Sequence, residues 1–526
     1  MKQVLCILPA LMMVLFFQTL TAQIVPSIEW QKCFGGSDYD EAFSVQNTTD
    51  GGFIAAGDSA SDYWIIKLNA AGDLMWEKSY GGSGGDVAYF IQETSDKGYI
   101  VAGSSGSNDG DVTGNHQGND GYPSIDYWIL RLDSVGNLIW EKSFGGKKDD
   151  AAKCVRQTND GGFIVAGSAH SNNGDVSGNH GNGNYDIWVV KLDTSGNLVW
   201  QKCFGGSGYE EANSIQQTND DGFIIAGGAV SMDGDVSGNH DPDVEDYWII
   251  KLDSVGNLMW QKCLGGTKTD VAYDIQQTDN GSFIIAGISA SGDGDVTGHH
   301  ESGQFIKYDQ WVVRLDANQN IVWEKSLGGS DFDYARSVCQ TMDGGFVIAG
   351  DTWSVDGDVT GNNNGDINYW ILKLDTDGSL LWQKCMGGSE YDWGYSVRQT
   401  PDSGYMVAGT SRSNDGDVSG NHGMGDFWIV KLSRDVATGV APLPEESFSF
   451  YPNPVRSQLT INLPTSSNEA MIAVYDVQGK MTSLPVSYQS DKARLNTANL
   501  PDGFYTFQIT DKKTGKTEVG KFVKQE

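Results

Sequence analysis

The sequence predicts an all-β protein, a seven-bladed β-propeller closed by the N-terminal strand, plus a small C-terminal β-sandwich. The first observation is a motif of roughly 60 residues that recurs along most of the chain. The second is that each copy holds four short apolar segments separated by Asp, Gly and Asn turns. The third is composition: 526 residues include 68 Gly, 16 Trp and 21 Tyr, which favours short strands over helices.

Each repeat opens with a Trp-(Gln/Glu)-Lys-(Cys/Ser) strand that runs into a Gly-Gly pair. The tryptophans of this strand are Trp30, Trp76, Trp140, Trp200, Trp260, Trp323 and Trp382. A second tryptophan marks another strand, at Trp64, Trp128, Trp188, Trp248, Trp311, Trp370 and Trp428. In the fourth copy we expect strands at 212–217, 223–227, 247–252 and 258–264. A lone four-stranded sheet cannot cover both its faces, so the copies should pack face to face around an axis.

The ends of the repeat region predict how the ring closes. The last copy ends near Asp435 without its fourth strand, whereas a strand at 27–34 precedes the first complete copy. The N-terminal strand can therefore complete the last blade. The repeat motifs GGSxxDxA, QTxDGGFIVAG and DYWIIKLDxxGN resemble those of bacterial seven-bladed propellers of the SBBP type, over residues 27–435. This resemblance implies the fold and no particular activity.

Charge and cysteine content exclude several classes of protein. The formal net charge is −34, which disfavours nucleic acid and anionic membranes as partners. Cys33, Cys203, Cys263 and Cys385 occupy one repeat position in different blades, too far apart for disulfides, so we expect free, packed thiols.

The first 22 residues have the features of an export signal. Lys2 is followed by an almost wholly apolar run at 4–17, and the small residue Ala22 precedes a plausible cleavage point. That run is short for a membrane span, and no other segment is long enough, so we expect no transmembrane segment. We therefore predict a signal peptide at 1–22, a propeller at 23–435, a linker at 436–446 and a final domain at 447–526.

The final domain predicts the export route. Its composition changes abruptly: tryptophan disappears, lysines concentrate, and about seven short strands suggest a small β-sandwich. The segments FYPNP at 450–454, YDVQGK at 475–480, LPDGFY at 500–505 and KFVK at 521–524 resemble the C-terminal sorting domain of type IX secretion substrates of Bacteroidetes. The residues that carry this sorting-signal resemblance are Tyr451, Pro452, Asn453, Pro454, Gly479, Gly503, Tyr505, Lys521 and Lys524. Membership implies passage through the periplasm and outer membrane by the type IX secretion machinery, then release or attachment at the cell surface.

Six long loops carry a motif of the form (N/D)-G-D-V-(S/T)-G-N-H. All should lie on one face of the propeller, and the first repeat lacks the motif, which should leave a notch in the rim. Asp-x-Asp-x-(Ser/Thr)-Gly presents oxygens at alternate positions, as in the first half of a calcium loop. The candidate Ca²⁺ ligands are Asp109, Asp111, Thr113, Asp233, Asp235, Ser237, Asp293, Asp295, Thr297, Asp356, Asp358, Thr360, Asp415, Asp417 and Ser419. The alternative is that these side chains cap their own loop backbone, and both interpretations stay open.

Two further sets of residues have a structural and a functional interpretation. Six histidines lie in the long loops, where we expect loop-fixing hydrogen bonds rather than a transition metal. An acid follows each Gly-Gly pair, at Asp40, Asp86, Asp150, Glu210, Asp270, Asp333 and Asp392. This ring of carboxylates either caps backbone N–H groups or binds a cation or a polyhydroxylated ligand.

No catalytic motif is recognisable, and no cofactor is indicated beyond the candidate calcium. The leading hypothesis is a secreted or surface-exposed, non-catalytic propeller that binds a glycan or a protein on its long-loop face. The alternative is a secreted polysaccharide-active hydrolase, in which one blade should break the repeat with unique polar residues. The departures present are modest, chiefly Trp353, Trp393 and an insert at 117–125, and they favour binding.

Overall fold

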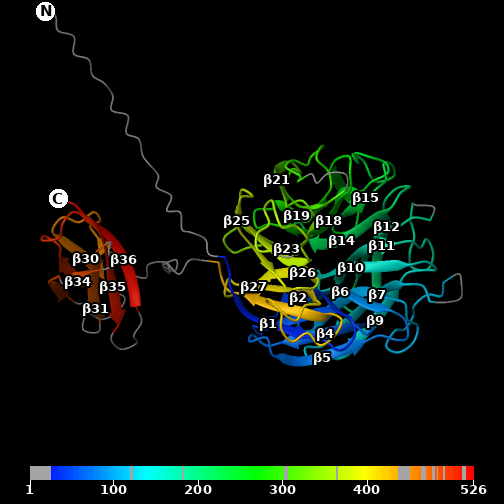
Figure 1. The fold of residues 1–526 in the computed structure, drawn as a ribbon, viewed down its shortest axis with the longest axis horizontal. Helices are drawn as coiled ribbons and strands as arrows, with labels where there is room; N and C mark the ends of the chain where they lie inside the picture. Colours follow the sequence, from blue (N-terminus) through cyan, green and yellow to red (C-terminus); the bar gives the residue numbers. More distant parts are fainter. Residues whose placement is uncertain are drawn as a thin grey trace, which may run out of the picture. The chain divides into compact units, whose positions relative to one another are not determined.

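A computed structural model describes residues 25–118, 123–180, 183–300, 306–362, 365–435, 450–463, 470–476, 480–482, 484–489, 492–511 and 517–525. The predicted signal peptide and linker lie outside these residues. The chain divides into two compact units, Met1–Asp435 and Val436–Glu526. Every regular element of the described residues is a β-strand (Figure 1). No helix long and apolar enough to cross a membrane occurs among them.

The first unit consists of seven four-stranded antiparallel sheets. Sheets one to three contain β2 (Asp40–Asn47), β3 (Phe53–Ser59), β4 (Asp62–Leu68), β5 (Leu74–Tyr80); β6 (Asp86–Glu93), β7 (Tyr99–Ser105), β8 (Asp126–Leu132), β9 (Leu138–Phe144); β10 (Asp150–Gln157), β11 (Phe163–Ala169), β12 (Asp186–Leu192), β13 (Leu198–Phe204). Sheets four to six contain β14 (Glu210–Gln217), β15 (Phe223–Ala229), β16 (Asp246–Leu252), β17 (Leu258–Leu264); β18 (Asp270–Gln277), β19 (Phe283–Ser289), β20 (Asp309–Leu315), β21 (Ile321–Leu327); β22 (Asp333–Gln340), β23 (Phe346–Thr352), β24 (Asn368–Leu374), β25 (Leu380–Met386). The seventh contains β26 (Asp392–Gln399), β27 (Tyr405–Ser411), β28 (Asp426–Leu432) and β1 (Ile28–Phe34).

The sheets form the blades of a propeller, as the sequence predicts. The first strand of each sheet contacts the first strand of the next, and β2 contacts β26 and β27, so the seventh blade lies against the first. These seven strands therefore line the central axis. The N-terminal strand β1 pairs with β28, with Cys33 opposite Trp428. Trp428 donates its indole N–H to Gln31 Oε1 at 2.9 Å, the same contact that Trp188 makes with Gln201 within the third blade.

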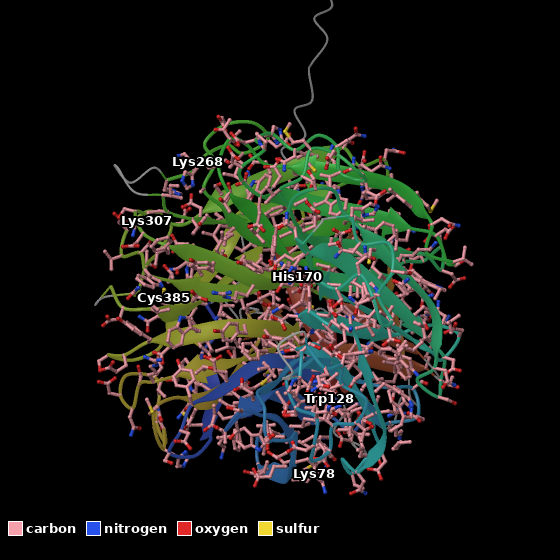
Figure 2. The ribbon with its side chains drawn as sticks, turned by 90° about the vertical axis from the view of Figure 1, so that its right-hand side faces the viewer. Lys78, Trp128, His170, Lys268, Lys307 and Cys385 are labelled. Atoms are coloured by element: carbon pink, nitrogen blue, oxygen red, sulfur yellow. The ribbon has the colours of Figure 1, made fainter. Side chains whose placement is uncertain are left out.

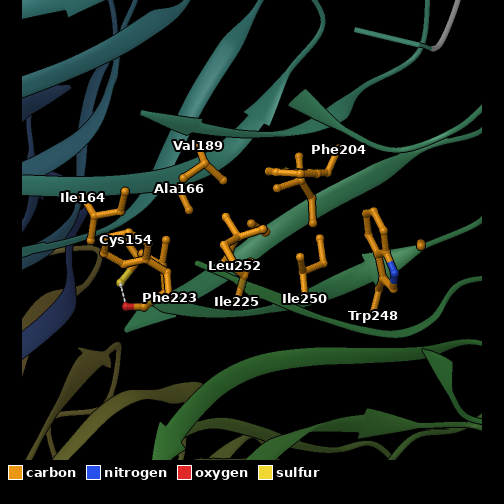
Figure 3. Close-up of a cluster of buried hydrophobic side chains, with 14 of the residues drawn as sticks. Cys154, Ile164, Ala166, Val189, Phe204, Phe223, Ile225, Trp248, Ile250 and Leu252 are labelled. Atoms are coloured by element: carbon orange, nitrogen blue, oxygen red, sulfur yellow. Dashed lines mark hydrogen bonds between the residues drawn. The ribbon is translucent and has the colours of Figure 1, made fainter. Parts of the chain in front are cut away.

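Neighbouring blades pack through buried apolar and aromatic side chains. Figure 3 shows one such interface, in which Ile164, Ala166 and Val189 of the third blade meet Phe223, Ile225 and Trp248 of the fourth. Tyr127 is fully buried and donates its hydroxyl to the carbonyl oxygen of Trp188 in the next blade, at 3.0 Å. Tyr63, Tyr247 and Tyr369 make the same inter-blade hydrogen bond.

The outer strands extend this packing toward the rim. Trp76 of β5 meets the edge of Tyr99 in the next blade with ring centroids 5.8 Å apart, and six other outer-strand tryptophans make the equivalent contact. Gly136, in the turn after β8, has φ +81°, and a Cβ there would lie 2.8 Å from the Trp76 ring. Both the positive φ and the close approach require glycine at this turn.

The second unit holds two four-stranded sheets around its own core. Their strands are β29 (Phe450–Tyr451), β30 (Gln458–Asn462), β34 (Lys492–Asn496), β33 (Val486–Gln489); β32 (Met481–Thr482), β31 (Ala470–Asp476), β35 (Gly503–Asp511) and β36 (Thr517–Lys524). Leu459, Ile461 and Leu495 of the first sheet share a core with Phe507 and Phe522 of the second. This is the β-sandwich that the sequence predicts.

We predict that β1 is required for a stable ring. Deletion of residues 25–34 should leave β28 with an unpaired edge and expose Trp428, so the thermal midpoint should fall by more than about 10 °C, or the protein should aggregate. The control is a permuted chain in which residues 28–34 follow β28 through a five-residue turn copied from 253–257. Calorimetry should show near-native stability for the permuted chain, and unchanged stability of the deletion variant would contradict the prediction.

Candidate functional site

The acids that follow each Gly-Gly pair are buried caps. Asp150 is fully buried, and its two oxygens accept hydrogen bonds from the backbone N–H groups of Gly146 and Ser171 at 2.9 and 3.0 Å. The other six positions repeat the bond to the second glycine of the pair. The backbone-capping alternative therefore accounts for this ring of carboxylates.

Some of these caps have strongly raised pKa values. Burial, together with the charge of nearby Asp126, raises the pKa of Asp150 to about 7 although two backbone N–H groups oppose the shift. Burial likewise raises the pKa of Asp333 to about 7 and that of Asp270 and Asp392 to about 6. The charge of Asp126 acts on Asp150 because the two carboxyl groups lie close together: a Cβ added at Gly145 would contact both side chains.

The candidate calcium ligands are engaged in protein hydrogen bonds, and the aspartates cap the backbone of the adjacent Gly-Gly loop rather than that of their own loop. Asp109 Oδ1 accepts from the N–H of Ser83 at 2.7 Å, and Asp233, Asp293, Asp356 and Asp415 make the equivalent bond. Asn173 makes the same bond to Lys147 with an amide oxygen, so the contact needs no carboxylate. Among the described residues, no group of three or more His, Cys, Asp or Glu side chains converges as a metal site.

The other two positions of that motif have separate partners. Asp111 Oδ2 accepts weakly from Gly81 N–H at 3.3 Å, and the equivalent aspartates Asp235, Asp295, Asp358 and Asp417 do the same. The hydroxyl of Thr113 bonds to Glu141, and Thr297 bonds to Glu324. Ser237, Thr360 and Ser419 instead accept from glutamines of the outer strands.

Five long-loop histidines each form a hydrogen bond with a buried aspartate, which is the loop-fixing role expected from the sequence. His240 Nδ1 lies 2.5 Å from Asp246 Oδ2, and the backbone N–H of His240 donates to the same oxygen. His116, His180, His300 and His422 repeat this arrangement. Burial alone would lower the pKa of His240, but the hydrogen bond and charge of Asp246 raise it.

Three positions per blade vary among the repeats while their neighbours stay constant. They are the residue before the first strand, the second residue of that strand, and the residue after the second strand. In the sixth blade they are Phe332, Tyr334 and Trp353, and in the seventh Tyr391, Trp393 and Arg412. In each of these blades, a backbone hydrogen bond holds two of the three positions side by side. The Trp353 N–H donates to the Phe332 carbonyl, and the Arg412 N–H donates to the Tyr391 carbonyl.

Aromatic side chains at these positions, together with Tyr308 just before the third strand of the fifth blade, form a continuous ridge on the long-loop face. We call it the aromatic ridge; it consists of Tyr308, Phe332, Tyr334, Trp353, Tyr391 and Trp393. Trp353 and Tyr391 are 36% and 40% exposed, and their rings lie 14° from parallel with centroids 6.4 Å apart. Trp353 and Tyr391 belong to adjacent blades, so only the arrangement of the blades around the axis brings these two large exposed side chains together.

Cations and acids border the aromatic ridge. The Arg412 guanidinium lies over the rings of Tyr39, Tyr391 and Trp393 and donates from Nε to the Tyr39 hydroxyl at 2.9 Å. Lys307, labelled in Figure 2, lies 4.0 Å above the ring of Phe332 and forms an ion pair with Asp331. The ridge therefore offers apolar faces beside hydrogen-bond donors and acceptors.

In the first blade, two acidic side chains lie opposite each other on the same long-loop face. Its second and third strands are joined by a tight turn at Ala60 and Ser61, both with positive φ, where other blades have the long loop. Glu41 of β2 lies opposite Asp58 of β3. Burial and then the neighbouring charge of Glu41 raise the pKa of Asp58 to about 7. This pair lies beside the notch that the sequence predicts.

The opposite, tight-turn face carries a set of ion pairs that sequence reasoning missed. Lys67 is nearly buried, and its Nζ lies 2.8 Å from Asp50 Oδ2 in the turn between β2 and β3. Arg131, Lys191, Lys251, Lys373 and Lys431 pair in the same way with turn aspartates. Burial favours a higher pKa for Asp50, but hydrogen bonds from Lys67, Thr48 and Gly52 lower it to about 2. A lysine or arginine at the same position of every apolar third strand was the available signal.

The six cysteines of the described residues are free thiols, as expected. Burial raises the pKa of Cys33 and Cys385 to about 12, so these thiols are poor nucleophiles.

In the second unit, the residues of the sorting-signal resemblance come together along β36. Val523 N–H donates to Asn453 Oδ1 at 2.8 Å, so the FYPNP segment lies against the last strand. Tyr505 stacks on Phe522 and donates its hydroxyl to the Pro501 carbonyl. Lys524 is buried and pairs with Asp502, next to Gly503. Tyr451 is exposed, and Gly479 lies outside the described residues.

Comparison with known proteins identifies this unit. Residues 449–525 match the family model described as a secretion system C-terminal sorting domain. The C-terminal unit is a type IX secretion sorting domain. The protein is therefore exported through the type IX secretion system, to the cell surface or the medium.

The chain as a whole has more distant likenesses. The chain is 28% identical over 228 residues to the regulatory protein FlaEY of Caulobacter vibrioides; the match spans 42% of this chain and 24% of that protein. Among solved structures, PorZ, a surface component of the type IX secretion system of Porphyromonas gingivalis, is similar at 12% identity and TM-score 0.39, covering 94% of this chain and 60% of PorZ. The Neurospora crassa Pan2 WD40 domain is similar at 10% identity and TM-score 0.44, covering 78% of this chain and 96% of that domain.

Calcium binding by the long loops stays a prediction, and the loop contacts favour the hydrogen-bonded alternative. We predict that addition of EGTA shifts the thermal midpoint by less than about 1 °C, because each motif residue already has a protein partner. Calcium titration of the chelated protein, followed by differential scanning fluorimetry, measures this. A saturable rise with calcium that is lost in Asp233→Asn/Asp235→Asn would establish the calcium loop instead.

We also predict that the propeller loses stability as the pH rises from about 5 to about 8. A carboxyl whose folded-state pKa is raised contributes stability that is fully present below its unfolded pKa, near 4, and is lost as the pH passes its folded pKa. For Asp150, Asp270, Asp333 and Asp392 the loss therefore extends from a pH of about 4 up to the folded pKa of about 6 or about 7. The raised pKa of His240 acts in the same direction.

Thermal midpoints across this pH range test the prediction. Asp150→Asn should reduce the fall, whereas Asp193→Asn, in an exposed turn where hydrogen bonds lower the aspartate pKa, should leave the slope unchanged. A midpoint that rises with pH would contradict the assignment of these caps.

Proposed function

We propose that this protein is an exported propeller that binds carbohydrate at the channel mouth on its long-loop face. The type IX sorting domain supports export. One observation carries the binding assignment: exposed, nearly parallel rings of Trp353 and Tyr391 stand where the repeats differ from one another. Large exposed aromatic side chains in a soluble protein indicate an interaction surface.

The chemistry of the aromatic ridge fits a sugar better than a purely apolar partner. A pyranose has apolar C–H faces that stack on aromatic rings and hydroxyl edges that need both donors and acceptors. The Arg412 guanidinium and Tyr39 hydroxyl supply donors, whereas Glu41 and Asp58 supply acceptors. The backbone bonds between loops hold the rings in place before the ligand arrives, which limits the entropy cost of binding.

A hydrolase is the alternative, and the facing acids of the first blade are the observation that favours it. Asp58, with a pKa of about 7, has the protonation that a general acid needs, and Glu41 lies opposite it on the neighbouring strand. In the binding protein that we propose, the same two side chains accept hydrogen bonds from sugar hydroxyls.

We predict that Trp353→Ala and Tyr391→Ala each weaken glycan binding at least about tenfold, since a stacked aromatic contact contributes on the order of 1 kcal/mol beyond its buried area. The mature protein is screened against an array of neutral and acidic glycans, and dissociation constants of the hits are measured by calorimetry. Met342→Ala, an exposed apolar side chain on the opposite face, is the matched control and should bind as the parent does.

Two outcomes would overturn this assignment. Absence of binding to every glycan, or binding that survives loss of both rings, would exclude the aromatic ridge as a sugar site. Release of reducing ends from a bound polysaccharide, abolished by Asp58→Asn with binding retained, would establish the hydrolase.

A further inference from the structure

A second, chemically different cavity lies on the propeller axis at the tight-turn end. Its volume is about 420 Å³, within the size range of small-molecule pockets. It is lined by the ends of the axial strands β6, β10, β14, β18, β22 and β26 and by the turns that follow β10 and β14. It is distinct from the aromatic ridge, which lies on the long-loop face.

A ring of side chains narrows the channel beyond this cavity. Each axial strand has a β-bulge after its third residue, and the bulged residue lines a smaller cavity of about 100 Å³. The bulged residues are Phe43, Tyr89, Lys153, Asn213, Tyr273, Arg336 and Tyr395. Phe43 contacts both Tyr89 and Tyr395, and Arg336 lies over Tyr273 and Tyr395. The larger cavity is therefore a pocket entered from the tight-turn face.

The glutamines of the pocket present hydrogen-bond donors to it. Gln92 Oε1 accepts from the N–H of Gln157 in the next blade at 2.8 Å, and Gln216 and Gln276 make the equivalent inter-blade bond at 2.7 Å. A backbone N–H can bond only to the amide oxygen, so these bonds fix the orientation of each side-chain amide. No protein acceptor is bonded to their Nε2 groups within the described part of the chain, which leaves three NH₂ groups at the pocket wall.

Two arginines add positive charge, and both are held in place. The Arg156 guanidinium lies 4.3 Å from the centre of the Phe90 ring, and its Nε donates to the Ile215 carbonyl at 3.4 Å. Arg398 donates from Nε to Gln46 Oε1 at 3.1 Å and from Nη1 to the Val397 carbonyl at 2.7 Å. Among the described residues, no protein group accepts a hydrogen bond from Nη1 or Nη2 of Arg156 or from Nη2 of Arg398, so these groups can donate to a ligand.

The acids near the pocket already accept hydrogen bonds or form ion pairs with protein groups. Asp274 is the one carboxylate among the lining residues, and it accepts from Ser214 Oγ at 2.8 Å and from the N–H groups of Ile275 and Val338 at 2.9 and 3.0 Å. The aspartates of the surrounding turns pair with the nearly buried lysines and arginine described above. The pocket is thus rich in donors on a chain whose net charge is −34.

We propose that this axial pocket binds a small organic oxyanion, a molecule that carries carboxylate or phosphate groups. Guanidinium and amide N–H groups form charge-assisted, often paired hydrogen bonds to such oxygens. The cavity volume exceeds what a single inorganic ion fills, so the ligand has an organic skeleton. The proposal is independent of carbohydrate binding, since it uses the other end of the channel.

The test uses the full mature chain with citrate and inorganic phosphate as probes, at constant ionic strength against sodium chloride. Citrate should raise the thermal midpoint in a saturable way and bind measurably by calorimetry, and phosphate should bind more weakly. Arg156→Gln and Arg398→Gln should each weaken citrate binding at least about tenfold. Lys202→Gln removes the same charge from an exposed outer strand and should leave the citrate affinity unchanged.

The variant Gln92→Glu tests ligand binding in the pocket without removing the contact between the blades. Glutamate keeps the oxygen that accepts the Gln157 N–H but replaces the donor NH₂ with a carboxylate oxygen, so the blade contact survives while citrate is repelled. Glycan binding at the aromatic ridge should be unaffected by this variant. If citrate binds no better than chloride, or if Gln92→Glu and Arg156→Gln both bind it as the parent does, the pocket is not an oxyanion site.

Discussion

The structure depends on one constraint: a four-stranded blade can bury both of its faces only against two neighbours. The interfaces combine apolar packing with a small number of specific bonds. Tyr127 reaches across to the Trp188 carbonyl, and the side-chain oxygen of Gln157 accepts the Ser95 N–H of the preceding blade. Because every blade needs two partners, the ring must close, and β1 completes the seventh sheet with the same Trp428 to Gln31 bond that other blades make internally.

Because of this constraint, some side chains recur in the blades and hold the loops in place, whereas others are free to differ between blades. The Asp150-type caps, the His240 to Asp246 links and the Lys67 to Asp50 pairs recur around the ring and hold the loops at fixed positions. Trp353 and Arg412 stand on backbone that is already bonded to Phe332 and Tyr391. Side chains at such positions can change without disturbing the core, so these few positions carry the differences between one blade and another.

The two ends of the channel consequently have different chemistry. At the long-loop mouth, exposed aromatic rings stand beside Arg412, Glu41 and Asp58, which suits a polyhydroxylated ligand. At the tight-turn end, amide and guanidinium donors surround a cavity whose one lining acid is already satisfied. The bulged residues lie between them. The sorting domain is a separate compact unit with its own core.

The sequence by itself determined the number of blades, the strands of the repeat and the closing role of β1, because repeat spacing and strand alternation are local properties of a chain. Free cysteines and backbone-capping acids were predictable for the same reason. The sorting domain was predicted from its resemblance to a known family. Only the tertiary structure decided that Trp353 lies against Tyr391 of the next blade and that Arg156 and Arg398 meet in one pocket. The two residues of each pair lie in different blades, so the packing of the blades into a ring brings them together.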